Sequence, residues 1–324
     1  MTDHTIAADD DGIRLDRWFK RHYPGFPHAL LEKNLRKGVI RLDGKKAKTS
    51  DRVGEGQILG VRCQVTGVGE GNLTSATRHL TPDDSRQMER IVLYKDANLI
   101  VINKPFGLAV QGGTKVGKNI DAMLDALKFE NAQRPKLVHR LDRDTSGVLV
   151  LARSAKAASR LADGFAGKAI EKTYLALVHN VPQPLSGFVE LPLLKAAQGD
   201  RELVGVDEEE GKYAKTEYRV IDALARKFAL VELKPLTGRM HQLRVHMAAI
   251  GCPIVGDHKY GGGLKFVGNN ISALGVQDVL HLHARRIVIP ANLTGDRTAV
   301  DVSAPLPPHM VKSFKALGID VPKK

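Results

Sequence analysis

The chain has 324 residues, enough for a sizeable core and for two domains, one of them small. Its 43% hydrophobic and 26% charged residues are ordinary for a soluble globular protein, but 49 Lys and Arg against 36 Asp and Glu give a net charge of +13, which favours a polyanionic partner such as nucleic acid. The sequence shows no secretory signal, no run long enough to span a membrane and no basic amphipathic helix flanked by Trp or Phe, so it argues against a secreted or membrane-bound protein.

The two cysteines, Cys63 and Cys252, suit a reducing compartment and are too few for a disulfide framework or a metal cage. We expect both to serve in packing. The acidic N-terminus, residues 1–11, contains no apolar segment that could direct secretion. We therefore expect a cytoplasmic protein, and since nothing in the sequence indicates an obligate partner subunit, we expect a monomer.

Two helices and a hairpin are the first predicted elements. Each helix places its apolar residues on one face, and the second ends at Gly38, a suitable C-cap. A strand over residues 39–42 and a turn at Asp43-Gly44 follow. The apolar residues of the two helical faces are Leu15, Trp18 and Phe19, and Leu31 and Leu35.

A cluster of positive charge covers the end of the second helix and the turn, with Asp43 as the single acid between residues 36 and 48. A run of charge is usually only a solvated face, but a helix end beside a tight turn is suited to binding phosphates. The segments R-L-D-R-W at residues 14–18 and L-R-K-G-V-I-R-L-D-G-K at residues 35–45 resemble the S4 (α-L) RNA-binding domain. The resemblance implies an RNA-binding domain over residues 1–65, with these phosphate contacts: Arg36, Lys37, Arg41, Lys45, Lys46 and Lys48.

Residues 66–86 are rich in Gly, Thr, Ser and Asp, and this composition predicts a flexible linker ahead of a larger module over residues 87–324. Long strands with a few interspersed helices indicate an α+β fold on a mixed, mainly antiparallel sheet. The expected strands cover residues 91–94, 99–102, 148–152, 173–178, 214–220 and 228–233, and the expected helices cover residues 120–127, 155–165 and a segment that begins near residue 241.

A polar turn, H-R-L-D-R-D-T-S-G over residues 139–147, leads into the buried strand at residue 148 and sets Asp142 between two arginines. Judged by residue types alone, a salt-bridged turn is the plainer interpretation. The run, however, resembles at every fixed position the H-R-L-D-x-x-T-[ST]-G signature of the RluA/RluC/RluD family of RNA pseudouridine synthases. The resemblance implies an enzyme that isomerises uridine to pseudouridine, an S4 domain ahead of the catalytic domain, and no cofactor or metal.

The same resemblance assigns the catalytic residues. Asp142 matches the family's catalytic aspartate, which either attacks C1′ of the ribose or removes the 2′ proton; Asp144 is a rival carboxylate at a position that varies in the family. Arg244, in a segment that matches G-R-x-H-Q-[IL]-R-x-H, is implied to pair with Asp142 and to keep it ionised. Tyr174, in the K-x-Y strand at residues 172–174, is implied to stack on the uracil and to handle the C5 proton.

Further residues are expected at the RNA. A stacked base must be extruded before it can react, and Arg140 matches the family residue that takes its place in the RNA. Arg239 and Gln242 are expected to support the pocket or touch RNA, and Lys104, in a K-P-x-G turn, is a candidate phosphate contact. Family members often carry His-x-Gly after this turn, whereas here Gln111 precedes Gly112, which puts in doubt a chemical role for that position.

The histidines do not form a metal motif. His241 and His246 are five residues apart on the predicted helix and so point about 140° away from each other. His281 and His283 fall in a segment that resembles a packing segment of the family.

The family resemblance is greatest to the RluC type, which implies large-subunit (23S) ribosomal RNA as the substrate. Three alternatives stay open: a transfer RNA pseudouridine synthase, a noncatalytic RNA-binding or ribosome-assembly factor with an S4 domain, and a hydrolase in which water intercepts the sugar. Analysis of the product separates isomerised, unchanged and abasic RNA.

Overall fold

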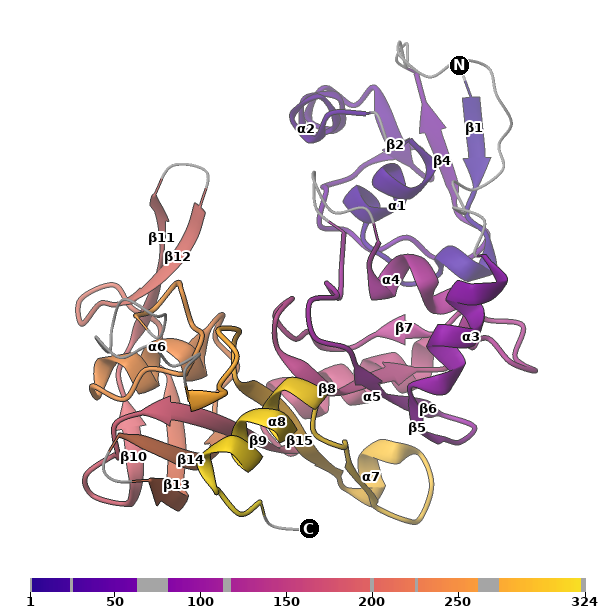
Figure 1. The fold of residues 1–324 in the computed structure, drawn as a ribbon. Helices are drawn as coiled ribbons and strands as arrows, with labels where there is room; N and C mark the ends of the chain where they lie inside the picture. Colours follow the sequence, from indigo (N-terminus) through magenta and orange to yellow (C-terminus); the bar gives the residue numbers. More distant parts are fainter. Residues whose placement is uncertain are drawn as a thin grey trace. The chain divides into compact units, whose positions relative to one another are not determined.

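The structure is a computed structural model that describes residues 2–23, 26–62, 81–112, 118–198, 201–224, 227–261 and 274–321. The chain divides into two compact units, shown as a ribbon in Figure 1. The first unit comprises residues 1–86 and 122–135, and the second comprises residues 87–121 and 136–324.

The first unit packs two helices against a small antiparallel sheet with the strand order β1-β4-β2-β3. The predicted helices are confirmed, and Gly38 adopts the left-handed conformation (φ 69°) that ends the second of them. The core of the first unit contains the predicted apolar residues of both helices: Leu15, Trp18, Phe19, Leu31 and Leu35. The elements are β1 (Thr2–Thr5), a 3-10 turn (Ala8–Asp10), α1 (Leu15–His22), α2 (His28–Lys37), β2 (Ile40–Leu42), β3 (Lys45–Lys46) and β4 (Ile58–Val61).

The segment predicted as a linker is partly helical. Residues 63–80, and with them Cys63, lie outside the described residues, but α3 spans Pro82–Arg90. The Thr81 hydroxyl accepts a hydrogen bond from the amide of Asp84 (3.2 Å), and the Asp84 carboxylate accepts one from the amide of Thr81 (3.3 Å), which is a helix-capping arrangement. The prediction relied on the polar composition of the segment and so missed the capping residues Thr81 and Asp84 near its end.

Residues 122–135 belong to the first unit although they lie within the sequence of the larger module. Lys128 forms ion pairs with Asp9 at 3.6 Å and with Asp125 at 3.2 Å, and Arg134 contacts Asp125 at 3.2 Å. The predicted helix over residues 120–127 is observed as α4 (Ile120–Met123) followed by a 3-10 turn (Leu124–Leu127).

The second unit is built on a ten-stranded sheet with the order β10-β13-β14-β9-β15-β8-β6-β5; β16 pairs with β15, and β7 pairs with β8. The named strands pair in antiparallel fashion except β15 with β8, which are parallel. The predicted mixed, mainly antiparallel sheet is therefore confirmed. Its strands are β5 (Val92–Lys95), β6 (Leu99–Lys104), β7 (Lys136–Leu137), β8 (Ser146–Ala152), β9 (Glu171–His179), β10 (Ser186–Glu190), β13 (Lys215–Leu224), β14 (Phe228–Pro235), β15 (Leu282–Ile289) and β16 (Val300–Ser303).

Helices cover both faces of the sheet. The even-numbered residues Ala176 and Val178 of β9 pack with α6 (Gln242–Ala249), and the odd-numbered Leu175 and Leu177 pack with α8 (Pro308–Leu317). All of β8 is buried, and its residues Val148, Val150 and Ala152 share a core with α5 (Ala155–Ala166). The remaining elements are α7 (Ala291–Thr294) and a hairpin of β11 (Leu193–Gln198) and β12 (Arg201–Val206), which projects from the sheet in Figure 1.

Gly147 allows β8 and β15 to approach each other closely. Its φ is +108°, and a Cβ built there would lie 2.2 Å from the carbonyl oxygen of Ala284. The parallel register pairs Gly147 with Ala284 and Ser146 with His283. The glycine that ends the signature run is therefore required by the backbone that holds the run in place.

None of the described helices is both long enough and apolar enough to cross a membrane. Cys252 is buried in the core beneath α6, as expected of a packing residue.

Candidate active site

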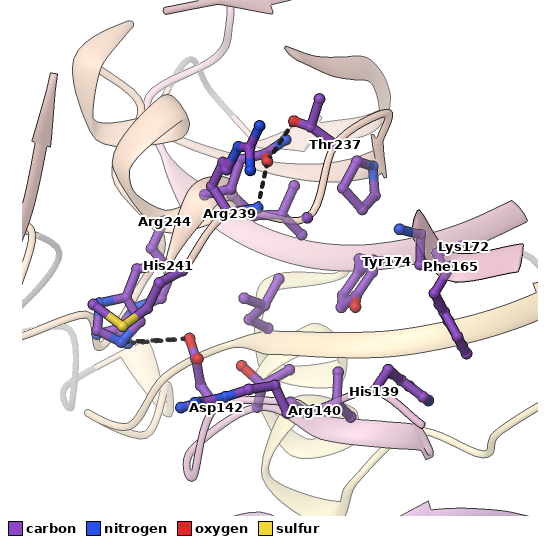
Figure 2. Close-up of a pocket in the computed structure, with 18 of the residues that line it drawn as sticks. His139, Arg140, Asp142, Phe165, Lys172, Tyr174, Thr237, Arg239, His241 and Arg244 are labelled. Carbon is purple, nitrogen blue, oxygen red and sulfur yellow. Dashed lines mark hydrogen bonds and ion pairs between the residues drawn. The ribbon is translucent and has the colours of Figure 1, made fainter. Parts of the chain in front are cut away.

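A cavity of about 520 Å³ opens in the second unit beside the signature loop (Figure 2). Its walls come from that loop, from β9, from the turn after β14 and from α6. Six of the residues predicted from sequence line it together: Arg140, Asp142, Tyr174, Arg239, Gln242 and Arg244.

Asp142 lies in the turn between β7 and β8, where its carbonyl accepts a hydrogen bond from the amide of Thr145 (3.2 Å). Its side chain is 22% exposed. Asp142 lines both this cavity and a neighbouring one of about 810 Å³, whereas the exposed Asp144 lines only the neighbouring one. Of the two carboxylates left open by the sequence, Asp142 is thus the one in the cavity with Tyr174 and Arg244.

Arg244 faces Asp142, but its shorter contacts are to another acid. Its Nη1 is 3.6 Å from Oδ2 of Asp142. Its Nε and Nη2 both donate hydrogen bonds of 2.8 Å to the two carboxylate oxygens of Asp257. Burial alone would lower the pKa of Arg244, but the hydrogen bond and charge of Asp257, with the charge of Asp142, raise it above its usual value.

Asp257 was not predicted from sequence. Its side chain is fully buried, and its Oδ1 also accepts the amides of Lys259 (3.1 Å) and Tyr260 (3.2 Å). Gly256 before it has φ +72°, and a Cβ there would lie 2.0 Å from the carbonyl oxygen of Val279. The sequence did carry a signal for this turn, because a glycine and an acid directly follow the buried Ile254 and Val255.

His241 is a second neighbour of Asp142 that sequence analysis considered only as a metal ligand. It is the N-cap of α6 in a left-handed conformation (φ 52°), and its Nε2 is 3.7 Å from Oδ2 of Asp142. The Tyr260 hydroxyl lies 2.7 Å from Nδ1 of His241 and accepts the amide of Val204 (3.1 Å). Burial lowers the pKa of His241, although the charge of Asp142 opposes that shift. A neutral imidazole that accepts from Tyr260 presents Nε2–H to Asp142.

Tyr174 lies between Asp142 and the far end of the cavity, where Lys172 and Phe165 are found (Figure 2). The ring packs against the core under α6, and β9 pairs it with Leu233 and Ala284. Burial, and secondarily the charge of Asp142, raise the pKa of the Tyr174 hydroxyl well above its usual value. The hydroxyl is therefore protonated over the whole neutral range.

Gln242 supports the pocket, which is the first of the two roles expected for it. It is buried, and its Oε1 accepts the Thr237 hydroxyl (2.6 Å) and the amide of Arg239 (3.0 Å). Its Nε2 donates to the Lys215 carbonyl (2.9 Å) and the Thr216 hydroxyl (3.0 Å). Through these four hydrogen bonds, the Gln242 amide fixes the turn after β14 to β13. Arg239 is exposed at the cavity wall, where its Nε donates to the Tyr213 carbonyl (3.0 Å).

Lys104 is not available to a phosphate, which corrects the expectation from the K-P-x-G turn. It is fully buried, and its Nζ donates to the carbonyls of Pro105 (2.9 Å), Leu108 (2.8 Å) and Arg143 (2.9 Å). Burial lowers the pKa of Lys104 to about 7, yet three carbonyl acceptors favour the ammonium form, since a neutral amine has only two N–H groups. Lys104 thus joins the K-P-x-G turn to the signature loop.

The other predicted contacts are solvent-accessible. Arg140 is exposed and lines both cavities. In the first unit all six basic residues of the helix end and turn are exposed, and Arg41 donates hydrogen bonds to the carbonyls of Gly38 (2.9 Å) and Gly44 (3.0 Å).

His281 and His283 pack as expected, and His246 is a third buried histidine outside the cavity. His281 contacts the Ser313 hydroxyl at 2.8 Å, His283 contacts the Ser146 hydroxyl at 2.9 Å, and His246 contacts the Thr216 hydroxyl at 2.9 Å. Within the described residues there is no group of three or more His, Cys, Asp or Glu side chains that could hold a metal.

Comparison with known proteins supplies the family. The model of the RNA pseudouridylate synthase family matches residues 98–249. The ribosomal large subunit pseudouridine synthase C of Rickettsia bellii is 36% identical over 90% of this chain and 94% of its own length. The mitochondrial RNA pseudouridine synthase 4 of Arabidopsis thaliana is 33% identical over 96% of this chain and 80% of its own length.

A solved structure agrees with these relatives. The human RNA pseudouridylate synthase domain containing 4 protein superposes with a TM-score of 0.61 at 32% identity, over 74% of this chain and 97% of the human chain. The residues matched by the family model, 98–249, include Asp142, Tyr174 and Arg244. The chain belongs to the RNA pseudouridine synthase family, in its RluA/RluC/RluD branch.

Proposed function

We propose that this protein isomerises uridine to pseudouridine in large-subunit ribosomal RNA. The observation that carries the proposal is the meeting of Asp142, Tyr174 and Arg244 in one cavity of a chain whose bacterial relatives are named for that substrate. The net charge of +13 suits a large polyanion.

The geometry supports a reaction contained within the nucleoside. Asp142 either attacks C1′ or removes the 2′ proton, the N1–C1′ bond breaks, and its electron pair goes to the uracil. The base turns and C5 bonds to C1′, while either the Asp142–C1′ bond breaks or the 2′ proton is returned to the ribose. The C5 proton then leaves and N1 gains a proton. Arg244, already held by Asp257, supplies a fixed positive charge beside Asp142, and Tyr174 supplies an aromatic face for the base.

The target base must leave its stack before it can enter the cavity, at a cost of a few kcal/mol. Arg140 is exposed at the rim and carries a planar guanidinium that can stack in the vacated place. Arg239, also exposed at the wall, is proposed as a further RNA contact.

We also propose that residues 1–65 act as an S4-type RNA-binding domain, joined through residues 66–86 to the catalytic domain over residues 87–324. Its support is the two-helix and sheet packing of the first unit and the exposure of its six basic residues. Phosphate contacts away from the cavity raise affinity for a large folded RNA. We also propose that the protein is a monomer, and a ribosomal substrate supports a cytoplasmic location.

Replacement of Asp142 by Asn tests the proposal. The wild-type protein should release tritium from [5-³H]uridine-labelled, unmodified large-subunit ribosomal RNA and leave pseudouridine on nucleoside analysis. Asp142→Asn should release none while it binds RNA with unchanged affinity, because the amide cannot act as nucleophile or base. Asp144→Asn, an exposed neighbour, should remain active.

The products also discriminate between the alternatives. Pseudouridine in transfer RNA but not in ribosomal RNA would change the substrate, abasic sites would indicate a hydrolase, and unchanged RNA that is nonetheless bound would indicate a noncatalytic factor. An active Asp142→Asn enzyme would remove the proposed chemistry altogether.

A further inference from the structure

Lys172 is a cation that lines the cavity, and the reaction proposed above does not use it. It precedes Tyr174 by two residues on β9, so both side chains leave the same face of the sheet. Figure 2 shows Lys172 and Tyr174 side by side, with Asp142, His241 and Arg244 at the opposite end of the cavity.

No carboxylate among the residues that the structure describes pairs with the Lys172 ammonium. Within the described part of the chain, neither an acceptor nor a carboxylate is placed on it. Its charge is partly removed from water, and burial lowers its pKa. Removal of a charge from water costs free energy unless the charge is paired, so a cation without a partner in a ligand cavity indicates a partner that arrives with the ligand.

The neighbours of Lys172 do not supply that partner. His139 accepts the amide of Val150 at its Nε2 (2.8 Å) and stacks on Phe165 with ring centroids 4.2 Å apart. Burial, with the charge of Lys172 second, lowers the pKa of His139 to about 3, so this ring is neutral. The end of the cavity around Lys172 is therefore one cation beside aromatic rings.

The proposed function fixes which part of the substrate reaches this end. The ribose carbon C1′ must lie at Asp142, and N1 of the uracil is bonded to C1′. Across the pyrimidine ring from N1 is C4 with its carbonyl oxygen O4. A base stacked on Tyr174 with N1 toward Asp142 directs O4 away from Asp142, toward the end that holds Lys172.

We propose that the Lys172 ammonium donates a hydrogen bond to O4 of the target uracil and stabilises the negative charge that the ring acquires when the N1–C1′ bond breaks. This inference rests on the proposed function and adds a catalytic residue to it. The electron pair of the broken bond spreads over N1, O2 and O4, and remains on the base until C5 bonds to C1′. A cation at O4 is more strongly attracted to the detached base than to the neutral uridine, which is the condition for catalysis.

The same contact selects uridine over cytidine. Cytosine carries an amino group in place of O4, so an ammonium that has only donors would face another donor. Because a site built to bond one group leaves its own polar atom unpaired with the wrong ligand, discrimination by such a contact is strong.

The first experiment compares Lys172→Met, similar in length and without charge, with Lys156→Met, a matched change at an exposed lysine of α5. Single-turnover tritium release is measured on unmodified large-subunit ribosomal RNA, with RNA affinity and thermal unfolding measured in parallel. Lys172→Met should slow the reaction about 10- to 100-fold, the range expected for loss of a charged hydrogen bond, with RNA affinity within about twofold of wild type. Lys156→Met should react as wild type does, and Lys172→Arg, which keeps the charge, should recover part of the rate.

The second experiment removes the acceptor instead of the donor. A short RNA around the mapped target carries either uridine or 4-thiouridine, whose sulfur is a weaker hydrogen-bond acceptor. The thio substitution should slow wild type more than it slows Lys172→Met, because the variant has no bond to lose. This comparison is made within each enzyme, so it holds even if Lys172→Met is less stable.

Three results would overturn the inference. A wild-type rate in Lys172→Met would show that the charge is not used, and an equal slowing of both enzymes by 4-thiouridine would show that O4 is not the partner. Weaker RNA binding at an unchanged rate would assign Lys172 to a phosphate. In each case pseudouridine formation by wild type would leave the proposed function standing, whereas absence of pseudouridine from the wild-type reaction would remove both.

Discussion

Arg244 binds two carboxylates of different exposure and function. It gives two N–H groups to the buried Asp257 and keeps Nη1 for Asp142, 3.6 Å away. Its guanidinium also lies over the ring of Tyr260, with 5.1 Å from Cζ to the centroid. A charge fixed in this way needs no rearrangement during the reaction, which is the advantage of a preorganised site.

We expect Asp257→Asn to damage catalysis through Arg244, although residue 257 does not line the cavity. The amide cannot bind both guanidinium nitrogens as a carboxylate does, so Arg244 loses its orientation. The rate of tritium release should fall about 10- to 100-fold. Removal of one partner of a buried pair should also lower the free energy of unfolding by about 3 kcal/mol.

The control is Asp301→Asn, which breaks the exposed Arg286–Asp301 ion pair in the same unit. That change should cost little, because ion pairs in water contribute little to stability. Wild-type activity in a folded Asp257→Asn enzyme would show that Asp257 does not position Arg244.

Sequence motifs gave the correct role for the catalytic residues that line the cavity more often than for the buried residues that support its walls. Asp142, Tyr174 and Arg244 fall in matched motifs, and all three line the cavity. Lys104 and Gln242 fall in matched motifs too, but both are buried and bonded to backbone or neighbouring side chains. A motif shows that a residue type is needed and not whether water reaches it, because burial depends on contacts distant in the sequence.

At the scale of elements, the signature loop owes its position to the junction of β8 with β15. Strand β8 is buried along its length, and its first two residues pair with His283 and Ala284. The Ser146 hydroxyl also contacts Nδ1 of His283 at 2.9 Å. The loop that carries Asp142 therefore ends on two strands of the central sheet.

Gly147→Ala should destabilise this junction more than positive φ alone would. The new Cβ would approach the Ala284 carbonyl oxygen to 2.2 Å, so the strands must separate. Gly107→Ala is the matched control, because its φ is +78° but no atom lies within 4 Å of the added Cβ. Gly107→Ala should lower the free energy of unfolding by about 1 kcal/mol and Gly147→Ala by about 3 kcal/mol or more, as measured by urea unfolding. Equal losses would show that close approach is not the constraint.

Runs of apolar residues predicted six of the ten strands of the sheet, because central strands such as β6 and β8 are buried on both faces. It did not predict that residues 122–135 belong to the first unit. That arrangement depends on contacts such as Lys128 with Asp9, far apart in the sequence, and no local pattern encodes them. The helix α3 was missed for a different reason, since its capping residues lie in a segment of polar composition.

At the scale of the whole molecule, buried histidines make stability depend on pH. His281 and His283 are fully buried, and burial lowers the pKa of each to about 4. In the unfolded chain their pKa is about 6.5, so below that value the unfolded state binds more protons than the folded state. Their contribution to stability is therefore complete above pH 6.5 and is lost as the pH falls toward 4.

The free energy of unfolding should decrease from pH 6.5 to pH 5 with a slope that approaches about 1.4 kcal/mol per pH unit for each of the two histidines. This window lies above the usual range of carboxyl groups, which separates the two effects. Urea unfolding at a series of pH values measures the slope. A His283→Asn variant should show a shallower slope, and an unchanged slope would assign the pH dependence to other groups.

The basic surface of the first unit gives a prediction about salt. Replacement of Lys45, Lys46 and Lys48 by Gln should weaken RNA binding and reduce the slope of log affinity against log salt by about 2 to 3. The rate at saturating RNA should not change, since these lysines do not line the cavity. The same change at three exposed lysines of the second unit, Lys156, Lys312 and Lys315, should leave the salt slope near its wild-type value. Equal effects from the two triple variants would mean that only net charge matters.

The three hydrogen bonds of Lys104 connect two loops that are distant in the sequence. One ammonium group binds the carbonyls of Pro105 and Leu108 and also that of Arg143, next to Asp142. A fourth hydrogen bond connects the same two loops, because Nε of Arg143 donates to the Gly107 carbonyl (3.0 Å). The two loops must therefore shift together. A compound bound beside Phe106, in the neighbouring cavity, should inhibit the enzyme by displacing Asp142 without competing with the base for its pocket.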